Sequence, residues 1–292
     1  MSDQKPQRVF SMPRGWASSS RSSGTHTIVA RPPIESRKLI LETSFAIKDE
    51  FSKNEATKWA VQELKHRGLK RLFKPVTSTA YERLVQVFYK QLKYDCSRPD
   101  VLVSSIDDRD VELTIADVAA ALKCSHEPPD SDMPWIDCPS MPSIEDIVFN
   151  MCEGQYADSH RNAASKVKIP PKLWFVDVML YKNVCPLGHK TQRRDMFLSA
   201  LYLFHRGFWC SILEIIWRQI YKFWEKVHHR VAEHTKTWDL PFPFFITHIL
   251  RKKEIKGNAM DGPITKSHAS AESSGTRVVP TYLESQQHHS QS

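Results

Sequence analysis

The residues that come nearest to a metal site by type and spacing are Cys185 and His189, which enclose Pro-Leu-Gly. A cysteine and a histidine at this spacing could supply half of a tetrahedral zinc site. No second Cys/His pair of matching spacing follows, and the six cysteines form no motif. The first residues also lack the apolar core of a secretory leader. We therefore predict no metal, no cofactor, and free thiols in a reducing, intracellular compartment, with nucleus and cytoplasm both open.

Carboxylates are the second group that could do chemistry, because a transposase or nuclease needs several of them clustered around two metal ions. Asp107, Asp108 and Asp110 fall in a predicted turn, and Asp117 and Asp146 fall at predicted helix starts. The chain also has no P-loop, dinucleotide-binding fingerprint or Gly-x-Ser-x-Gly elbow. We expect structural roles for these acids and no enzyme activity.

Basic side chains offer a third kind of chemistry, the binding of phosphates. The segment from residue 161 to 194 holds eight basic residues and one acidic residue, a net charge of +7, in a chain of net charge +8. Trp174 and Phe175 lie within it and could stack on bases. The competing interpretation, which their helical spacing favours, is that both aromatics are core residues of an ordinary helix. The candidate nucleic-acid-binding residues are Arg161, Lys166, Lys168, Lys172 and Lys182.

The elements that would position these residues are mainly helical. Glycine is sparse, at 9 residues, and proline is common, at 18, which favours helices over a sandwich of short strands. Ser52 with Glu55, and Thr79 with Glu82, have the spacing of a capping box and predict two helix starts. Further helix starts are predicted at Thr114, Ser143, Pro171 and Pro243.

One strand pair is predicted, a small hairpin at about 101–113 with its polar turn at Asp107–Asp110. The longest helical tract is expected at about 192–231, with a break near Gly207. In its second half, apolar residues recur at steps of three and four, so we expect Ile216 and Ile220 to be buried.

The fold class predicted from these signals is mainly α (α+β), a helical domain with one small β-hairpin. The domain is expected at 45–260, between a disordered basic tail at 1–44 and a disordered tail at 261–292, both rich in polar residues without an apolar period. The most apolar stretch, 196–204, is far shorter than the roughly 20 residues that span a bilayer, so no membrane contact is predicted.

Three segments resemble the plant transposon protein domain family. The opening of that domain resembles Gly68–Pro75 followed by Ala80–Val85. Its strand and "Leu-Thr-x-x-Asp-Val-Ala" helix resemble Val111–Leu122, and its closing "Phe-Pro, then Ile-Thr" helix resembles Pro241–Leu250. The resemblance extends over about 48–263. It implies an origin in plant retroelements or host genes derived from them, and it brings no defined activity and no catalytic residues.

The distribution of charge leaves the partner open. The segment from residue 95 to 146 holds 13 acidic and 3 basic residues, a net charge of −10, against +7 in the segment from 161 to 194. Such asymmetry suits an anionic partner and a self-complementary assembly equally well. We expect a transposon-derived, non-enzymatic interaction module that binds itself or other proteins. The alternative is a sequence-nonspecific nucleic-acid-binding protein, and a residual transposase or nuclease is a remote third.

Overall fold

The computed structural model describes residues 34, 37–45, 54–98, 100–124, 141–153, 156–157, 160–186, 191–228, 239–256 and 263–265. Helices dominate this part of the chain, as predicted. They are α2 (Glu55–His66), α3 (Glu82–Lys90), α4 (Ile115–Leu122), α5 (Ile144–Cys152), α6 (Trp174–Asn183), α7 (Asp195–His205), α8 (Ile212–His228) and α9 (Pro243–Lys252), with short 3-10 helices η2 (Leu69–Phe73), η3 (Lys166–Lys168) and η4 (Pro171–Leu173).

The predicted hairpin is present as β4 (Val101–Ile106) and β5 (Arg109–Thr114). Its turn is shorter than predicted, because Arg109 and Asp110 already pair with Ile106 and Ser105. The turn residues Asp107 and Asp108 both have positive φ, at 49° and 58°. Two left-handed residues match the twist of the flanking strands, and aspartate tolerates this conformation better than most residues.

The expectation of a single strand pair is wrong. A third strand, β3 (Leu92–Tyr94), joins the hairpin in the order β3-β4-β5. A second three-stranded sheet is formed by β6 (Tyr156–Ala157), β7 (His160–Ser165) and β8 (Gln192–Arg194). Strands β3, β6 and β8 are three residues long or shorter, and β7 pairs irregularly with β6, so none carries an alternating pattern long enough for the sequence to show.

Several predicted helix boundaries are confirmed. Thr114 and Asp117 form a reciprocal capping box at α4, and the Ser143 side chain accepts a hydrogen bond from the Asp146 backbone N–H at the start of α5. Pro243 occupies the first turn of α9. The long tract divides at Gly207, whose φ of 74° ends α7 in the left-handed conformation that glycine adopts without strain.

Two predicted boundaries need correction. The N-cap of α2 is Asn54, whose side chain accepts from the Thr57 N–H at 3.1 Å, and Ser52 lies outside the described residues. Thr79 does not cap α3; it belongs to strand β2 (Thr79–Tyr81) and Tyr81 precedes the helix. A threonine before an acidic residue has the same local pattern in both settings, and here the pairing of β2 with a distant strand decides between them.

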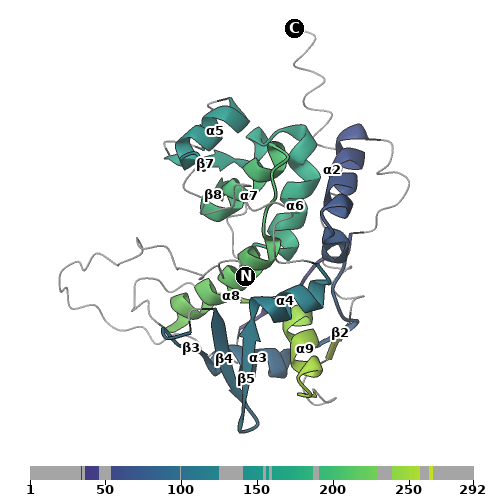
Figure 1. Cartoon of the computed structure of the whole chain (residues 1–292), viewed down its shortest axis with the longest axis vertical. Helices are drawn as coiled ribbons and strands as arrows, with labels where there is room; N and C mark the ends of the chain where they lie inside the picture. Colours follow the sequence, from purple (N-terminus) through teal and green to yellow (C-terminus); the bar gives the residue numbers. More distant parts are fainter. Residues whose placement is uncertain are drawn as a thin grey trace, which may run out of the picture.

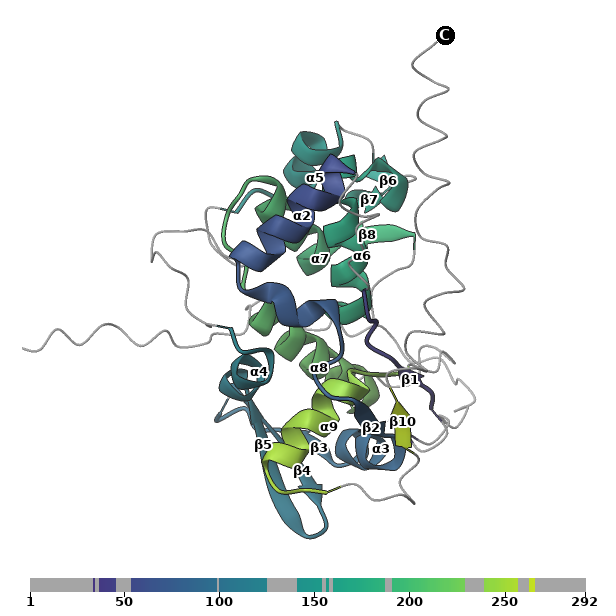
Figure 2. The same cartoon turned by 90° about the vertical axis from the view of Figure 1, so that its right-hand side faces the viewer.

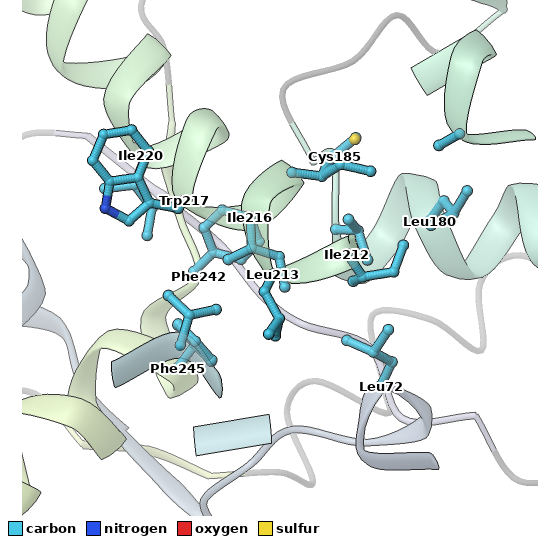
Figure 3. Close-up of a cluster of buried hydrophobic side chains, with 14 of the residues drawn as sticks. Leu72, Leu180, Cys185, Ile212, Leu213, Ile216, Trp217, Ile220, Phe242 and Phe245 are labelled. Atoms are coloured by element: carbon cyan, nitrogen blue, oxygen red, sulfur yellow. The ribbon is translucent and has the colours of Figure 1, made fainter. Parts of the chain in front are cut away.

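Helix α8 lies between two groups of elements, as Figures 1 and 2 show. One group contains α2, α5, α6, α7 and the β6-β7-β8 sheet, and the other contains α3, α4, α9 and the β3-β4-β5 sheet. Ile216 and Ile220 are buried, at 1% and 0% exposure, which confirms the predicted burial. Figure 3 shows Ile212, Leu213 and Ile216 of α8 within the cluster that also contains side chains of α6, α9 and η2. One continuous core therefore joins both groups.

Residues on both sides of the predicted domain belong to the fold. Strand β1 (Leu39–Ile40) pairs with β9 (Leu240–Pro241), and β10 (Pro263–Thr265) pairs with β2. The Glu42 carboxylate accepts hydrogen bonds from the backbone N–H groups of Phe244 at 3.1 Å and Phe245 at 2.7 Å. Glu42 thus caps α9 from 200 residues away, which no local pattern could reveal. In the part of the chain that is described, no helix has the length and apolar character needed to cross a membrane.

Candidate functional site

The structure brings some of the predicted basic residues together and separates others. Lys166 and Lys168 lie in η3 and Lys172 in η4, with Lys168 and Lys172 exposed and Lys166 half-buried. Lys182 lies in the last turn of α6, which extends away from η4 for 10 residues, or about 15 Å. Arg161 lies in β7. The predicted stretch therefore contributes a compact trio of lysines rather than a continuous row of five cations.

Arg193, which contributes to the net charge of +7, is not available to a ligand. Its side chain is 1% exposed and forms a two-pronged ion pair with Asp177, Nε to Oδ1 and Nη2 to Oδ2, the latter at 2.8 Å. The rings of Tyr181 and Phe197 lie 5.1 and 4.7 Å from its guanidinium carbon. This arrangement fixes β8 to α6, so Arg193 has a structural role.

The aromatic residues of the stretch pack inside the protein. Phe175 is 4% exposed, and its ring lies 5.6 Å from that of Phe45 and 6.2 Å from that of Phe73. Trp174 is half-buried and packs against the same core. The packing interpretation is confirmed for Phe175, which cannot stack on a base.

Two other elements bring new residues to the lysine trio. The Lys172 ammonium lies 5.7 Å from the centre of the half-buried Trp59 ring on α2. The pKa of His205, at the end of α7, is lowered by burial and then by repulsion from Lys172 and Arg206. Arg206 is exposed. We call Lys166, Lys168, Lys172, His205 and Arg206 the η4 surface.

His205 and Arg206 were missed by the sequence analysis because they follow Lys172 by more than thirty residues. Only the packing of η4 against α7 and α2 makes them neighbours. The buried Nδ1 atom of His205 has no hydrogen-bond partner among the described residues. A buried nitrogen without a partner costs free energy.

The acidic and metal-ligating candidates have structural roles where the structure describes them. Asp107 and Asp108 form the hairpin turn, and the Ser105 hydroxyl donates to Asp110 at 2.6 Å. Asp117 caps α4 and pairs with Lys253, with Oδ1 and Nζ 3.0 Å apart. Asp146 is hydrogen-bonded to Ser143, the N-cap residue of α5.

Cys185, the first residue of the possible zinc half-site, is 2% exposed, and burial raises the pKa of its thiol to about 12. A buried thiol of this kind is a packing residue rather than a nucleophile or a ready metal ligand. His189 lies outside the described residues. Within the described ranges, no three His, Cys, Asp or Glu side chains gather in a way that could hold a metal ion.

Comparison of the chain with protein-family models, with curated proteins and with solved structures finds no match.

Proposed function

We propose that this chain is a non-enzymatic interaction module whose partner is nucleic acid, held electrostatically at the η4 surface without reading the base sequence. The observation that carries the proposal is that Lys172 of η4 and Arg206 at the end of α7, both exposed, act on the same imidazole of His205. Exposed Lys168 of η3 lies four residues before Lys172. No ion pair neutralises these three within the described part of the chain.

The chemistry of the surface supports this choice of partner. Ammonium and guanidinium groups bind phosphates and release the counterions condensed on a nucleic acid, which gives affinity without sequence preference. The side chains of the η4 surface are cations and an imidazole carried on short helical segments. They include no set of amides aligned along a recognition helix that would read base edges.

The test is a fluorescence anisotropy titration of labelled DNA, single- and double-stranded and of several sequences, over a series of salt concentrations. The wild-type chain should bind at low salt, with affinity falling steeply as salt rises. The double variant Lys168→Glu, Lys172→Glu should lose affinity equally for all sequences. A matched control, Lys93→Glu with Arg109→Glu, reverses two exposed charges in the β3-β4-β5 sheet and should bind nearly as the wild type does.

Two results would contradict the proposal. A wild-type chain that binds no DNA at low salt would leave the η4 surface as a solvated or protein-facing surface. Equal losses in the η4 variant and the control would mean that only net charge matters. Far-UV circular dichroism should show unchanged helical content in both variants.

A second candidate function is self-association. The large hydrophobic side chains that are exposed among the described residues are Phe149 of α5, at 64%, and Val167 of η3, at 52%. Contiguous apolar patches mark protein interfaces, whereas single exposed side chains are common, so these two residues are candidate contacts and not a defined interface. A sedimentation coefficient that rises with concentration in the wild type, and not in Phe149→Ser, would support this function.

The origin of the chain is also a proposal. The resemblance of Gly68–Pro75, Val111–Leu122 and Pro241–Leu250 to the plant transposon protein domain supports descent from a plant retroelement. The remote alternative of a residual nuclease has no supporting observation, since the acids considered for it cap helices and form turns.

A further inference from the structure

A second group of cations gathers where α9, the end of α4 and η2 meet. His248, Arg251 and Lys252 lie at positions i, i+3 and i+4 of α9 and so share one side of the helix. Lys123 is the C-cap residue of α4, and Arg71 lies in η2. We call these five residues the α9 surface. All five lie outside the basic stretch from residue 161 to 194 that was considered for binding.

The packing of the elements holds these residues in one place. Helices α4 and α9 lie side by side in both views of the ribbon (Figures 1 and 2) and are in contact. The ion pair between Lys253 Nζ and Asp117 Oδ1, at 3.0 Å, joins the C-terminal end of α9 to the first turn of α4. The charge of Lys123, at the other end of α4, also acts on His248, so both ends of α4 lie near α9.

Cations from all three elements act on one imidazole, that of His248. The pKa of His248 is lowered by burial and then by repulsion from Lys252, Arg71, Arg251 and Lys123. These four groups, from all three elements, are the charged neighbours that act on the imidazole, and no carboxylate is among them.

The cluster is not neutralised from within the described protein. None of Arg71, Lys123, Arg251 and Lys252 forms an ion pair with a described residue. The carboxylate of Asp117 is occupied by Lys253 and by the capping box of α4. Like charges held together in this way are mutually repulsive, and a polyanion at the surface would relieve that repulsion.

We propose that the α9 surface binds the phosphate backbone of double-stranded nucleic acid as a second contact site, separate from the η4 surface. The proposal rests on the function proposed above. From His248 to Lys252 the helix rises about 6 Å, and a duplex presents one negative charge per roughly 1.7 Å of its axis. It therefore offers three to four charges over this length, a density that matches the cluster.

A duplex fits better than a single strand. Single-strand binding combines cations with exposed aromatic rings on which bases stack. The exposed large hydrophobic side chains of the described chain, Phe149 and Val167, lie in α5 and η3, outside the α9 surface. This surface thus presents charge without a stacking ring.

Binding should also change the protonation of His248. In the free protein the surrounding cations disfavour the charged imidazole, whereas a bound phosphate would favour it, so the pKa rises in the complex. The complex then takes up a proton, and affinity should increase as the pH falls toward and below the ordinary pKa of histidine, near 6.5.

The test compares two variants of equal charge in the full chain, titrated with a short DNA duplex across a salt series. One is Lys123→Gln, Arg251→Gln, Lys252→Gln on the α9 surface, and the other is Lys166→Gln, Lys168→Gln, Lys172→Gln on the η4 surface. Loss of three phosphate contacts should reduce the slope of log K against log salt by about 2–3. The α9 variant should show this reduction while its circular dichroism spectrum stays that of the wild type.

The results separate this inference from the proposed function. If the α9 variant keeps the affinity and slope of the wild type while the η4 variant loses them, the α9 site is refuted and the function stands. If the wild type binds no duplex at low salt, both fail. If polyglutamate competes as strongly as the duplex for the α9 surface, the partner is an acidic protein and the proposal is wrong.

A histidine variant provides a measurement that a purely structural role would not alter. His248→Ala should reduce the increase in duplex affinity between pH 7.5 and pH 6, by comparison with the wild type. An unchanged pH profile in His248→Ala would count against the α9 surface even if its charge variant were poorly folded.

Discussion

Replacing Asp177 with alanine leaves the Arg193 guanidinium buried without its counter-charge. Both side chains are 1% exposed in the folded protein, and the carboxylate accepts from two guanidinium nitrogens. The rings of Tyr181 and Phe197 remain, but a ring face offers far less to a desolvated cation than a carboxylate does.

The cost should be large. Breaking a buried pair by removing one partner typically destabilises a protein by about 3–5 kcal/mol, because the remaining charge is left uncompensated. For a chain of this size that corresponds to a melting temperature lower by about 6–20 °C. Arg193→Met should cost a similar amount, since it leaves the Asp177 carboxylate buried. The double variant Asp177→Ala, Arg193→Met removes both charges, so it should cost far less than the sum of the two single effects.

The assay is equilibrium unfolding in urea, followed by circular dichroism, for the wild type, the two single variants and the double variant. A matched control is the pair of Arg98 and Glu112, 2.5 Å apart, with both side chains nearly half exposed. Its single variants should each cost about 0–1 kcal/mol, and this effect should shrink at high salt. The effects at Asp177 and Arg193 should persist at high salt because solvent ions do not reach the pair.

The reasoning would be refuted if Asp177→Ala cost less than about 1 kcal/mol. It would also be refuted if the two single effects simply added in the double variant. Either result would mean that water reaches the pair and that β8 is not held to α6 by a desolvated ion pair.

Two further predictions concern stability. Ile216→Asp should cost at least about 4 kcal/mol, because it removes a 1% exposed side chain from the core and buries an unpaired charge. Urea unfolding measures this cost, and the control Gln62→Asp, at an exposed position, should stay within about 1 kcal/mol of the wild type. An unchanged unfolding midpoint in Ile216→Asp would place this side chain in solvent. Glu42, whose pKa is raised by burial from 4.5 to about 7, should stabilise the fold when protonated, so this contribution is fully present below about pH 4.5 and is lost as the pH rises to about 7. The difference in unfolding free energy between Glu42→Gln and the wild type should therefore shift by about 3 kcal/mol in favour of the variant over that range, and a difference independent of pH would contradict the assignment.

The sequence by itself determined the elements whose signals are local. The capping box at Thr114, the serine cap at Ser143, the proline in the first turn of α9 and the glycine break at residue 207 are all present. The periodic apolar residues of α8 also predicted that Ile216 and Ile220 are buried. Each of these signals depends on hydrogen bonds or side-chain directions within a few residues, which the chain carries wherever it folds.

Tertiary structure decided the remainder, because the deciding contacts join residues far apart in the sequence. Thr79 has the local pattern of a cap, yet pairing with β10 makes it part of a strand. Glu42 lies in the predicted tail, yet its carboxylate caps α9. Arg193 counts as one cation among eight in the sequence, whereas in the fold Asp177 neutralises it.

The same physical reason governs the candidate sites. Lys166, Lys168 and Lys172 could be found from sequence because they lie within one short stretch. The sequence could not predict that Arg71, Lys123 and His248 lie together. Arg71 and Lys123 are 52 residues apart in the chain, and Lys123 and His248 are 125 apart, so only the packing of η2, α4 and α9 makes them neighbours. Coulomb repulsion depends on distance in space, so composition gave the net charge of the chain, and the fold alone determined where that charge is concentrated.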